Sequence, residues 1–118
     1  MKEGIGKTGE LIAARFLLQK GYTFVAQNYF TKWGEIDIIA KKDDTLVFVE
    51  VKTTTLSDEF HVEQRVDALK MEKCLKAATR YLQEGSHEDE MVRFDVITIQ
   101  LNPTTKEARV QHFENITA

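Results

Sequence analysis

The chain has 118 residues, of which 42% are hydrophobic and 30% charged, and its formal net charge is −3. This length is typical of one domain, so we expect residues 1–118 to fold around a single core. No apolar run approaches the roughly 20 residues of a membrane-spanning helix, and the acidic balance disfavours a protein that contacts nucleic acid over a broad surface.

The N-terminal residues lack an apolar signal core, and the one cysteine, Cys74, cannot form an intramolecular disulfide. We therefore expect a cytoplasmic protein with no membrane role.

The first elements follow from helical spacing and turn residues. Apolar residues recur at helical spacing over residues 8–20, which predicts a helix with Thr8 as N-cap and Gly21 as its stop. Residues 22–30 alternate loosely as a strand, and Trp33 and Gly34 form a turn into the next strand. Trp33, at this hairpin tip, could pack on its own hairpin or stack on a base.

Two carboxylates and a lysine lie in the next two strands, which otherwise have the pattern of buried strands. Asp37 and Glu50 each stand between two branched apolar residues, and Lys52 shares a face with Glu50 because side chains alternate along a strand. Charges in such places are costly unless they are compensated. A divalent cation between Asp37 and Glu50 would compensate them, and a half-buried ion pair between Asp37 and Lys52, without chemistry, is the alternative.

Residues 41–45 are polar and short enough to join these strands as an antiparallel hairpin, which could bring Asp37 and Glu50 to one side. Strict alternation would divide the first strand into two faces. One face would hold Ile36, Ile38 and Ala40, and the other Glu35, Asp37 and Ile39.

The second half of the chain predicts a helix and two strands. Residues 53–59 form a polar loop, residues 62–84 a long helix, residues 94–101 a strand, and residues 108–113 an edge strand. The apolar stripe of the helix is Ala68, Met71, Leu75, Ala78 and Leu82, with Cys74 buried on its flank. The same helix is locally basic, so Lys70 and Lys73 lie on either a solvated face or a phosphate-contacting one. The scattered His61, His87 and His112 lack zinc-ligand spacing and are expected at the surface or in turns.

Four motifs together resemble the small bacterial YraN family over most of the chain. They are Gly6-Lys7-Thr8-Gly9-Glu10, Gly34-Glu35-Ile36-Asp37, Phe48-Val49-Glu50-Val51-Lys52 and Arg93-Phe94-Asp95-Val96. That family is similar in pattern to the restriction-endonuclease-like, or PD-(D/E)XK, superfamily, which includes archaeal Holliday junction resolvases. The resemblance implies an α/β, three-layer fold with a central mixed sheet flanked by helices, in the order α-β-β-β-α-β-β.

The superfamily motif, an acidic residue on the first helix, an Asp and a Glu-x-Lys, implies that Glu10, Asp37, Glu50 and Lys52 are catalytic. Mg²⁺ or Mn²⁺ would be held by Asp37, Glu50 and the Val51 carbonyl, while Glu10 would bind a second metal ion or orient the attacking water. Lys52 would lie beside that water or the charge developing on phosphorus.

The remaining implied roles concern binding and support. Lys7, Lys70 and Lys73 would contact nucleic acid, and Asp95 would support the structure. Where family members commonly carry a basic residue near Thr53 or Thr54, this chain has only hydroxyls.

Three classes of function are compatible with these residues. They are a metal-dependent DNA endonuclease acting on phosphodiester bonds, for example in branched or recombination intermediates; a nucleic-acid-binding protein with little catalysis; and a protein-interaction domain with a structural ion-pair network. A homodimer and a protein partner are both compatible with the resemblance.

Overall fold

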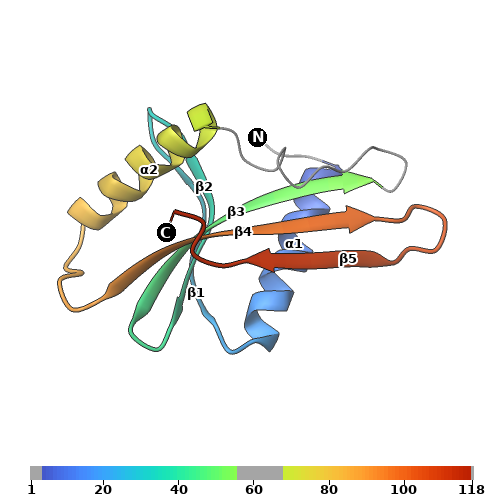
Figure 1. Cartoon of the computed structure of the whole chain (residues 1–118), viewed down its shortest axis with the longest axis horizontal. Helices are drawn as coiled ribbons and strands as arrows, with labels where there is room; N and C mark the ends of the chain where they lie inside the picture. Colours follow the sequence, from blue (N-terminus) through green and yellow to red (C-terminus); the bar gives the residue numbers. More distant parts are fainter. Residues whose placement is uncertain (1–3, 56–67, 118) are drawn as a thin grey trace.

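The computed structural model describes residues 4–55 and 68–117 as a mixed α/β structure (Figure 1). Its elements are α1 (Ile5–Gln19), β1 (Thr23–Phe30), β2 (Glu35–Lys42), β3 (Thr45–Thr55), α2 (Ala68–Gln83), β4 (Met91–Leu101) and β5 (Ala108–Phe113). The predicted fold class and the element order α-β-β-β-α-β-β are confirmed.

The five strands form one sheet in the order β1-β2-β3-β4-β5, with β1 and β5 at its edges. The β3–β4 pair is parallel and the other three pairs are antiparallel, so the sheet is mixed. The two helices pack on opposite faces of the sheet (Figure 1). Within the described ranges, neither helix has both the length and the apolar character needed to cross a bilayer.

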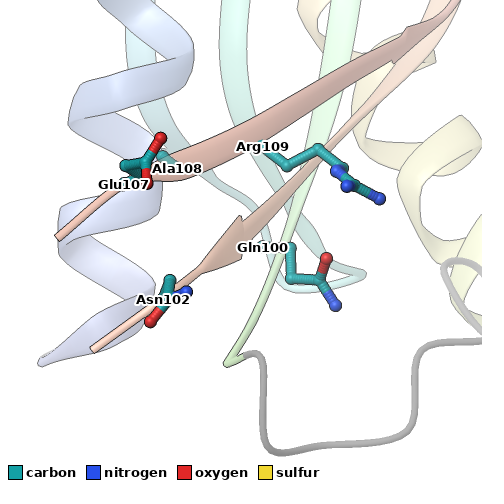
Figure 2. A pocket seen from close by; sticks show the side chains of 5 residues that line it. All are labelled: Gln100, Asn102, Glu107, Ala108 and Arg109. Atoms are coloured by element: carbon teal, nitrogen blue, oxygen red, sulfur yellow. The ribbon is translucent and has the colours of Figure 1, made fainter. Parts of the chain in front are cut away.

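The β4–β5 hairpin carries a surface cavity of about 390 Å³ near its turn (Figure 2). The cavity is lined by Gln100, Asn102, Glu107, Ala108 and Arg109. Gln100 and Arg109 are partners in the strand register, and the other lining residues lie at the strand ends. Charges of both signs therefore line this cavity.

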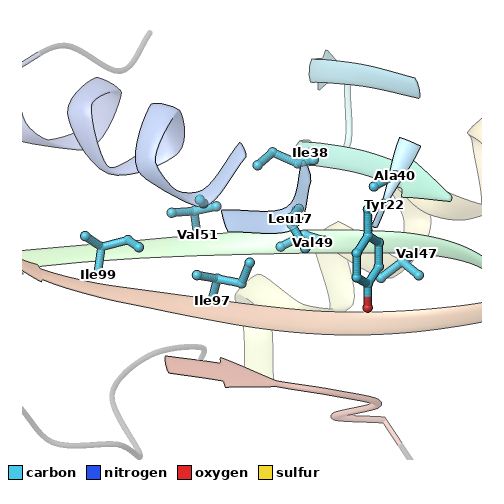
Figure 3. Close-up of a cluster of buried hydrophobic side chains, with 10 residues drawn as sticks. Leu17, Tyr22, Ile38, Ala40, Val47, Val49, Val51, Ile97 and Ile99 are labelled. Carbon is cyan, nitrogen blue, oxygen red and sulfur yellow. The ribbon is translucent and has the colours of Figure 1, made fainter. Parts of the chain in front are cut away.

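The core on the α1 side is mainly aliphatic, with Tyr22 as its one buried aromatic residue among those described (Figure 3). Leu17 and Ala13 of α1 pack against Val49 and Val51 of β3 and Ile97 of β4, and all five are buried. Because Val47, Val49 and Val51 face α1 while Leu46 and Phe48 face α2, the predicted alternation of β3 is confirmed.

The core on the α2 side contains more aromatic side chains. The ring of Phe48 stacks on that of Phe94 and meets the edge of Tyr81, at centroid distances of 6.0 and 5.8 Å. Cys74 is buried in this cluster, as predicted, together with Ala77 and Ala78. Leu75 was predicted in the buried stripe but is 42% exposed, because the face of α2 that contacts the sheet is centred on Cys74 and Ala78.

Several predicted boundaries are wrong by a few residues. The first helix begins at Ile5 after Gly4, whose φ is 60°, so Thr8 lies inside α1 and its hydroxyl donates to the Gly4 carbonyl. β3 continues to Thr55 through the start of the predicted loop, and β4 begins at Met91 rather than Phe94. The rest of that loop, His61 and the predicted first turns of the long helix lie outside the described residues.

A buried charge network joins the edge strand to the α1 side of the molecule. Both Nε and Nη2 of Arg93 donate to the fully buried Asp95, each at 2.9 Å, and the backbone N–H of Asn115 donates to it as well. His112 Nε2 lies 2.7 Å from Asp95, and Lys20 Nζ lies 2.9 Å from His112 Nδ1. The ammonium can only donate, so Nδ1 accepts and Nε2 donates to Asp95. The predicted surface position of His112 is therefore wrong, and the predicted structural role of Asp95 fits this network.

Candidate metal centre

Glu10 reaches the sheet because α1 approaches β3 closely at the preceding residue. A Cβ on Gly9 would lie 1.8 Å from the hydroxyl oxygen of Thr53, so only glycine fits this approach. Glu10 is buried, and Asn28 Nδ2 donates to its Oε1 at 3.0 Å. Asn28 holds this position with a φ of 50°, a left-handed conformation that asparagine tolerates better than most residues.

Asp37 lies where β2 separates from β3. Pairing between these strands ends at Ile38 and Val49, and the backbone N–H of Val51 instead donates to Asp37 Oδ2 at 2.8 Å. The side chain of Asp37 thus provides the acceptor that the neighbouring backbone would otherwise supply. The alternation of β2 also breaks here, because Ile36 packs on the α2 side while Ile38 and Ala40 pack on the α1 side. The predicted common face for these three residues is wrong for that reason.

Three carboxylates converge at this break in the sheet. Single oxygens of Glu10, Glu35 and Asp37 all lie within 4.8 Å of one another. Oxygens bound to one Mg²⁺ at about 2.1 Å are about 3.0 Å apart when adjacent in the octahedral shell and about 4.2 Å apart when opposite, so a shift of about 1 Å in each oxygen would bring all three into one shell. These hard oxygen donors fit Mg²⁺ or Mn²⁺.

Glu35 is a candidate ligand that the sequence reasoning missed. Alternation placed it on the face of Asp37, which was the available signal, but no rule of spacing distinguished it from an ordinary strand-end glutamate. Its position beside Glu10 depends on how α1 docks, and the sequence of β2 does not contain that information.

Glu50 on β3 interacts with Asp37 and is also buried. Lys70 Nζ is 2.9 Å from its Oε1, and Cys74 Sγ donates to its Oε2 at 3.2 Å. Burial and the adjacent Asp37 carboxylate raise the pKa of Glu50 to about 7, although Lys70 opposes the shift. Burial and Glu50 raise the pKa of the Cys74 thiol to about 12, so Cys74 acts as a protonated donor.

A cavity of about 170 Å³ opens onto these groups, and it receives residues from β2, β3 and α2. Its lining is Gly34, Glu35, Asp37, Glu50, Lys70, Lys73 and Cys74. A Cβ on Gly34 would lie 3.0 Å from the backbone oxygen of Lys73, so this glycine lets α2 pack against the entrance to β2. Carboxylates and ammonium groups therefore share one small concave site.

The structure brings together most of the predicted site residues. Asp37 and Glu50 interact, Glu10 joins Asp37, and Lys70 and Lys73 line the same cavity. At this site the structure pairs Glu50 with Lys70, and the alternative pair between Asp37 and Lys52 stays a prediction.

The structure shows where Lys52, Lys7 and Val51 lie, and their predicted roles stay predictions. Lys52 is half-buried on β3, two residues beyond Glu50, and Lys7 is exposed on α1. Val51 contributes its backbone N–H to Asp37, and a ligand role for its carbonyl stays a prediction.

The sequence matches one protein family and is similar to several of its members. Residues 9–99 match the uncharacterised protein family UPF0102. A UPF0102 protein of Alkaliphilus oremlandii is 38% identical over 117 residues, which cover 98% of each chain. A UPF0102 protein of Caldanaerobacter subterraneus is 40% identical over 86% of this chain and 84% of its own. A UPF0102 protein of Syntrophus aciditrophicus is 42% identical over 83% and 77%, respectively.

Proposed function

The chain belongs to the uncharacterised protein family UPF0102, and we propose that it is a metal-dependent endonuclease that hydrolyses phosphodiester bonds of DNA. This is the family that the sequence motifs predicted under the name YraN. Branched and recombination intermediates are the substrates to test first, because the site residues match the motif of the resolvase-containing superfamily.

The observation that supports the proposal is the convergence of four carboxylates from three elements beside a cavity with two lysines. Glu10, Glu35 and Asp37 form one cluster, and Glu50 meets Asp37 from the neighbouring strand. Four carboxylates this close repel one another when ionised, which is costly in a buried place. A divalent cation would relieve that repulsion.

Glu10, Glu35 and Asp37 would hold Mg²⁺ or Mn²⁺, with Glu50 as a further ligand from β3. The bound ion would polarise the scissile phosphate and make the attacking water more acidic. Lys52 would contribute positive charge where negative charge develops on phosphorus. Once a metal ion compensates Glu50, Lys70 would be able to donate to a substrate phosphate, together with Lys73.

The choice of variant matters because Asp37 also accepts a buried backbone N–H. Asp37→Ala would leave that amide unsatisfied at a cost of about 1–3 kcal/mol, so a loss of activity in this variant would not separate chemistry from stability. Asp37→Asn retains a side-chain acceptor for Val51 and removes the charge. It is therefore the better test of chemistry.

The test is cleavage of labelled single-stranded, duplex, flap and four-way-junction DNA by purified protein with Mg²⁺ or Mn²⁺. Asp37→Asn should lower metal-dependent cleavage by at least about 100-fold, the effect that loss of one charge-stabilising group at an active site commonly has. Lys52→Ala should lower turnover more than it lowers Mn²⁺ affinity. Glu107→Gln, in the distant hairpin cavity, makes the same charge change as a control and should cleave like the parent.

Equal cleavage by the parent and Asp37→Asn would show that the activity does not arise at this site. If neither protein cleaves but the parent binds Mn²⁺ and DNA, the nucleic-acid-binding class of function replaces the nuclease. If the parent binds neither, the carboxylates and Lys70 form a structural network.

A further inference from the structure

A second cavity, of about 330 Å³, lies between α2 and the β1–β2 turn. It is lined by Trp33 from the turn and by Lys76, Thr79, Arg80 and Gln83 from α2. Spacings of three and four residues place these four side chains on one face of the helix. An indole ring and two cations thus share the walls of one concave surface.

The turn that carries Trp33 is held by its own hydrogen bonds. The hydroxyl oxygen of Thr31 accepts the backbone N–H groups of both Trp33 and Gly34, each at 3.1 Å, and Thr31 N–H donates to the Gly34 carbonyl at 2.8 Å. Trp33 is 41% exposed, and Lys32 Nζ lies 4.9 Å from the centroid of its ring. The ring is therefore presented to solvent from a fixed backbone.

The cavity of about 170 Å³ at Glu35, Asp37 and Glu50 is called the carboxylate cavity here. The residues that line it are sequence neighbours of those that line the second cavity, both in the β1–β2 turn and on α2. Gly34, which follows Trp33, and Lys73, one helical turn before Lys76, line the carboxylate cavity. The cations Lys70, Lys73, Lys76 and Arg80 extend along α2 over about 15 Å at 1.5 Å per residue. One strand of duplex DNA carries about four phosphates over that length, at 3.4 Å each.

The two cations of the second cavity are held by weak, exchangeable pairs. Lys76 lies 3.5 Å from Glu72 and Arg80 lies 3.5 Å from Glu84, both pairs at i,i+4 spacing with more than two fifths of each side chain exposed. Exposed pairs of this kind contribute little to stability, so a phosphate can replace either carboxylate at little cost.

We propose that this second cavity binds an unpaired nucleotide of the substrate, with its base stacked on Trp33 and its phosphate held by Lys76 and Arg80. Aromatic side chains stack on bases whatever their sequence, and this requires a base that is free of its duplex partner. Among the described residues, the hairpin cavity of Figure 2 lacks such chemistry, because those that line it supply one cation, one carboxylate and no aromatic ring. The inference rests on the proposed function and specifies its substrate: a strand that is unpaired next to the site of cleavage.

Trp33 is the only tryptophan of the chain, so its fluorescence reports on this cavity alone. The full-length protein, without divalent metal so that no cleavage occurs, is titrated with a 12-nucleotide oligothymidylate and with a blunt-ended duplex of two complementary strands. We expect saturable quenching by the single strand and much less by the duplex. Polyglutamate serves as an anionic polymer without bases and should not quench.

Variants are measured by anisotropy of a labelled oligothymidylate. Trp33→Ala should weaken binding about 5- to 150-fold, the range that loss of one base stack gives, and Trp33→Phe should weaken it less. Arg80→Ala should weaken binding and lower the slope of log affinity against log salt by about 0.7, the value of one phosphate contact on a single strand. Arg109→Ala, in the hairpin cavity, removes the same charge and should bind like the parent.

The inference and the proposed function can fail separately. Quenching that depends on Arg80, without any metal-dependent cleavage, would support the nucleotide site and contradict the nuclease proposal. Cleavage that depends on Asp37, with no quenching and with Trp33→Ala binding like the parent, would overturn the inference and keep the nuclease. Equal quenching by duplex or by polyglutamate would also overturn it.

Discussion

Asp95 is a fully buried carboxylate that several donors keep ionised. Burial alone would raise its pKa, but hydrogen bonds from His112, Arg93 and the Asn115 backbone, with the charge of Arg93, lower the pKa below its usual range. The pKa of Arg93 is raised in turn, chiefly by its hydrogen bonds to Asp95. The network joins β4, β5 and the end of α1, so we expect it to stabilise the fold and to contribute nothing to the candidate metal centre.

Asp95→Asn should destabilise the protein at neutral pH by about 3–5 kcal/mol, as expected when a buried charge pair loses one partner. Because the folded-state pKa of Asp95 lies below its unfolded value, the carboxylate stabilises the fold above the unfolded pKa of about 3.8. That contribution is lost as the pH falls through the folded pKa. The stability difference between parent and variant should therefore be full at pH 7 and shrink below about pH 4. Urea unfolding at a series of pH values measures it, and a difference that stays constant down to pH 2 would contradict this account.

At the scale of elements, two glycines set how closely the helices approach the site. Gly9 brings α1 against Thr53, and Gly34 lets the backbone of α2 at Lys73 approach β2. Each glycine is followed directly by a carboxylate of the candidate metal centre, Glu10 or Glu35. The same two short segments of the chain therefore set both how closely the helices pack and where these carboxylates lie.

Gly34→Ala tests this coupling, since its φ is not positive and the backbone itself accepts alanine. The new Cβ would meet the backbone oxygen of Lys73 at 3.0 Å, so α2 must shift by a few tenths of an ångström. We expect a stability loss of about 1–2 kcal/mol, in the range of overpacked sites, and a larger relative loss of Mn²⁺ affinity and cleavage. Gly85→Ala is the matched control, because its Cβ meets only the side chain of His87, away from the site. Equal losses of Mn²⁺ affinity in both variants would remove the argument.

The sequence predicted those features that depend on local pattern. Period-two alternation predicted the two faces of β3 and most of β4, and Gly21, whose φ is 91°, marked the end of α1. Features that depend on how the helices and strands pack against one another were not predicted. His112 is buried because the β4–β5 register brings it to Asp95, and Glu35 joins Glu10 only because α1 packs at Gly9.

At the scale of the whole molecule, segregation of charge makes a net charge of −3 compatible with the proposed nucleic-acid substrate. Carboxylates from α1, β2 and β3 converge at one point, while lysines and an arginine follow α2 beside them. A bound divalent cation would turn the most acidic point of this surface into part of a continuous basic track. Metal and DNA binding should therefore reinforce each other.

The same segregation predicts that divalent metal stabilises the whole fold. A cation that binds only the folded chain adds about 3 kcal/mol at 100 times its Kd, which for this length raises Tm by roughly 10 °C. Glu35→Gln removes one ligand and one repulsive charge, so it should show little of this rise while unfolding no earlier than the parent without metal. Thermal unfolding with Mg²⁺, against NaCl of equal ionic strength, measures both quantities, with Glu107→Gln as the charge-matched control. A rise in Tm as large for Glu35→Gln as for the parent would place the metal elsewhere on the molecule.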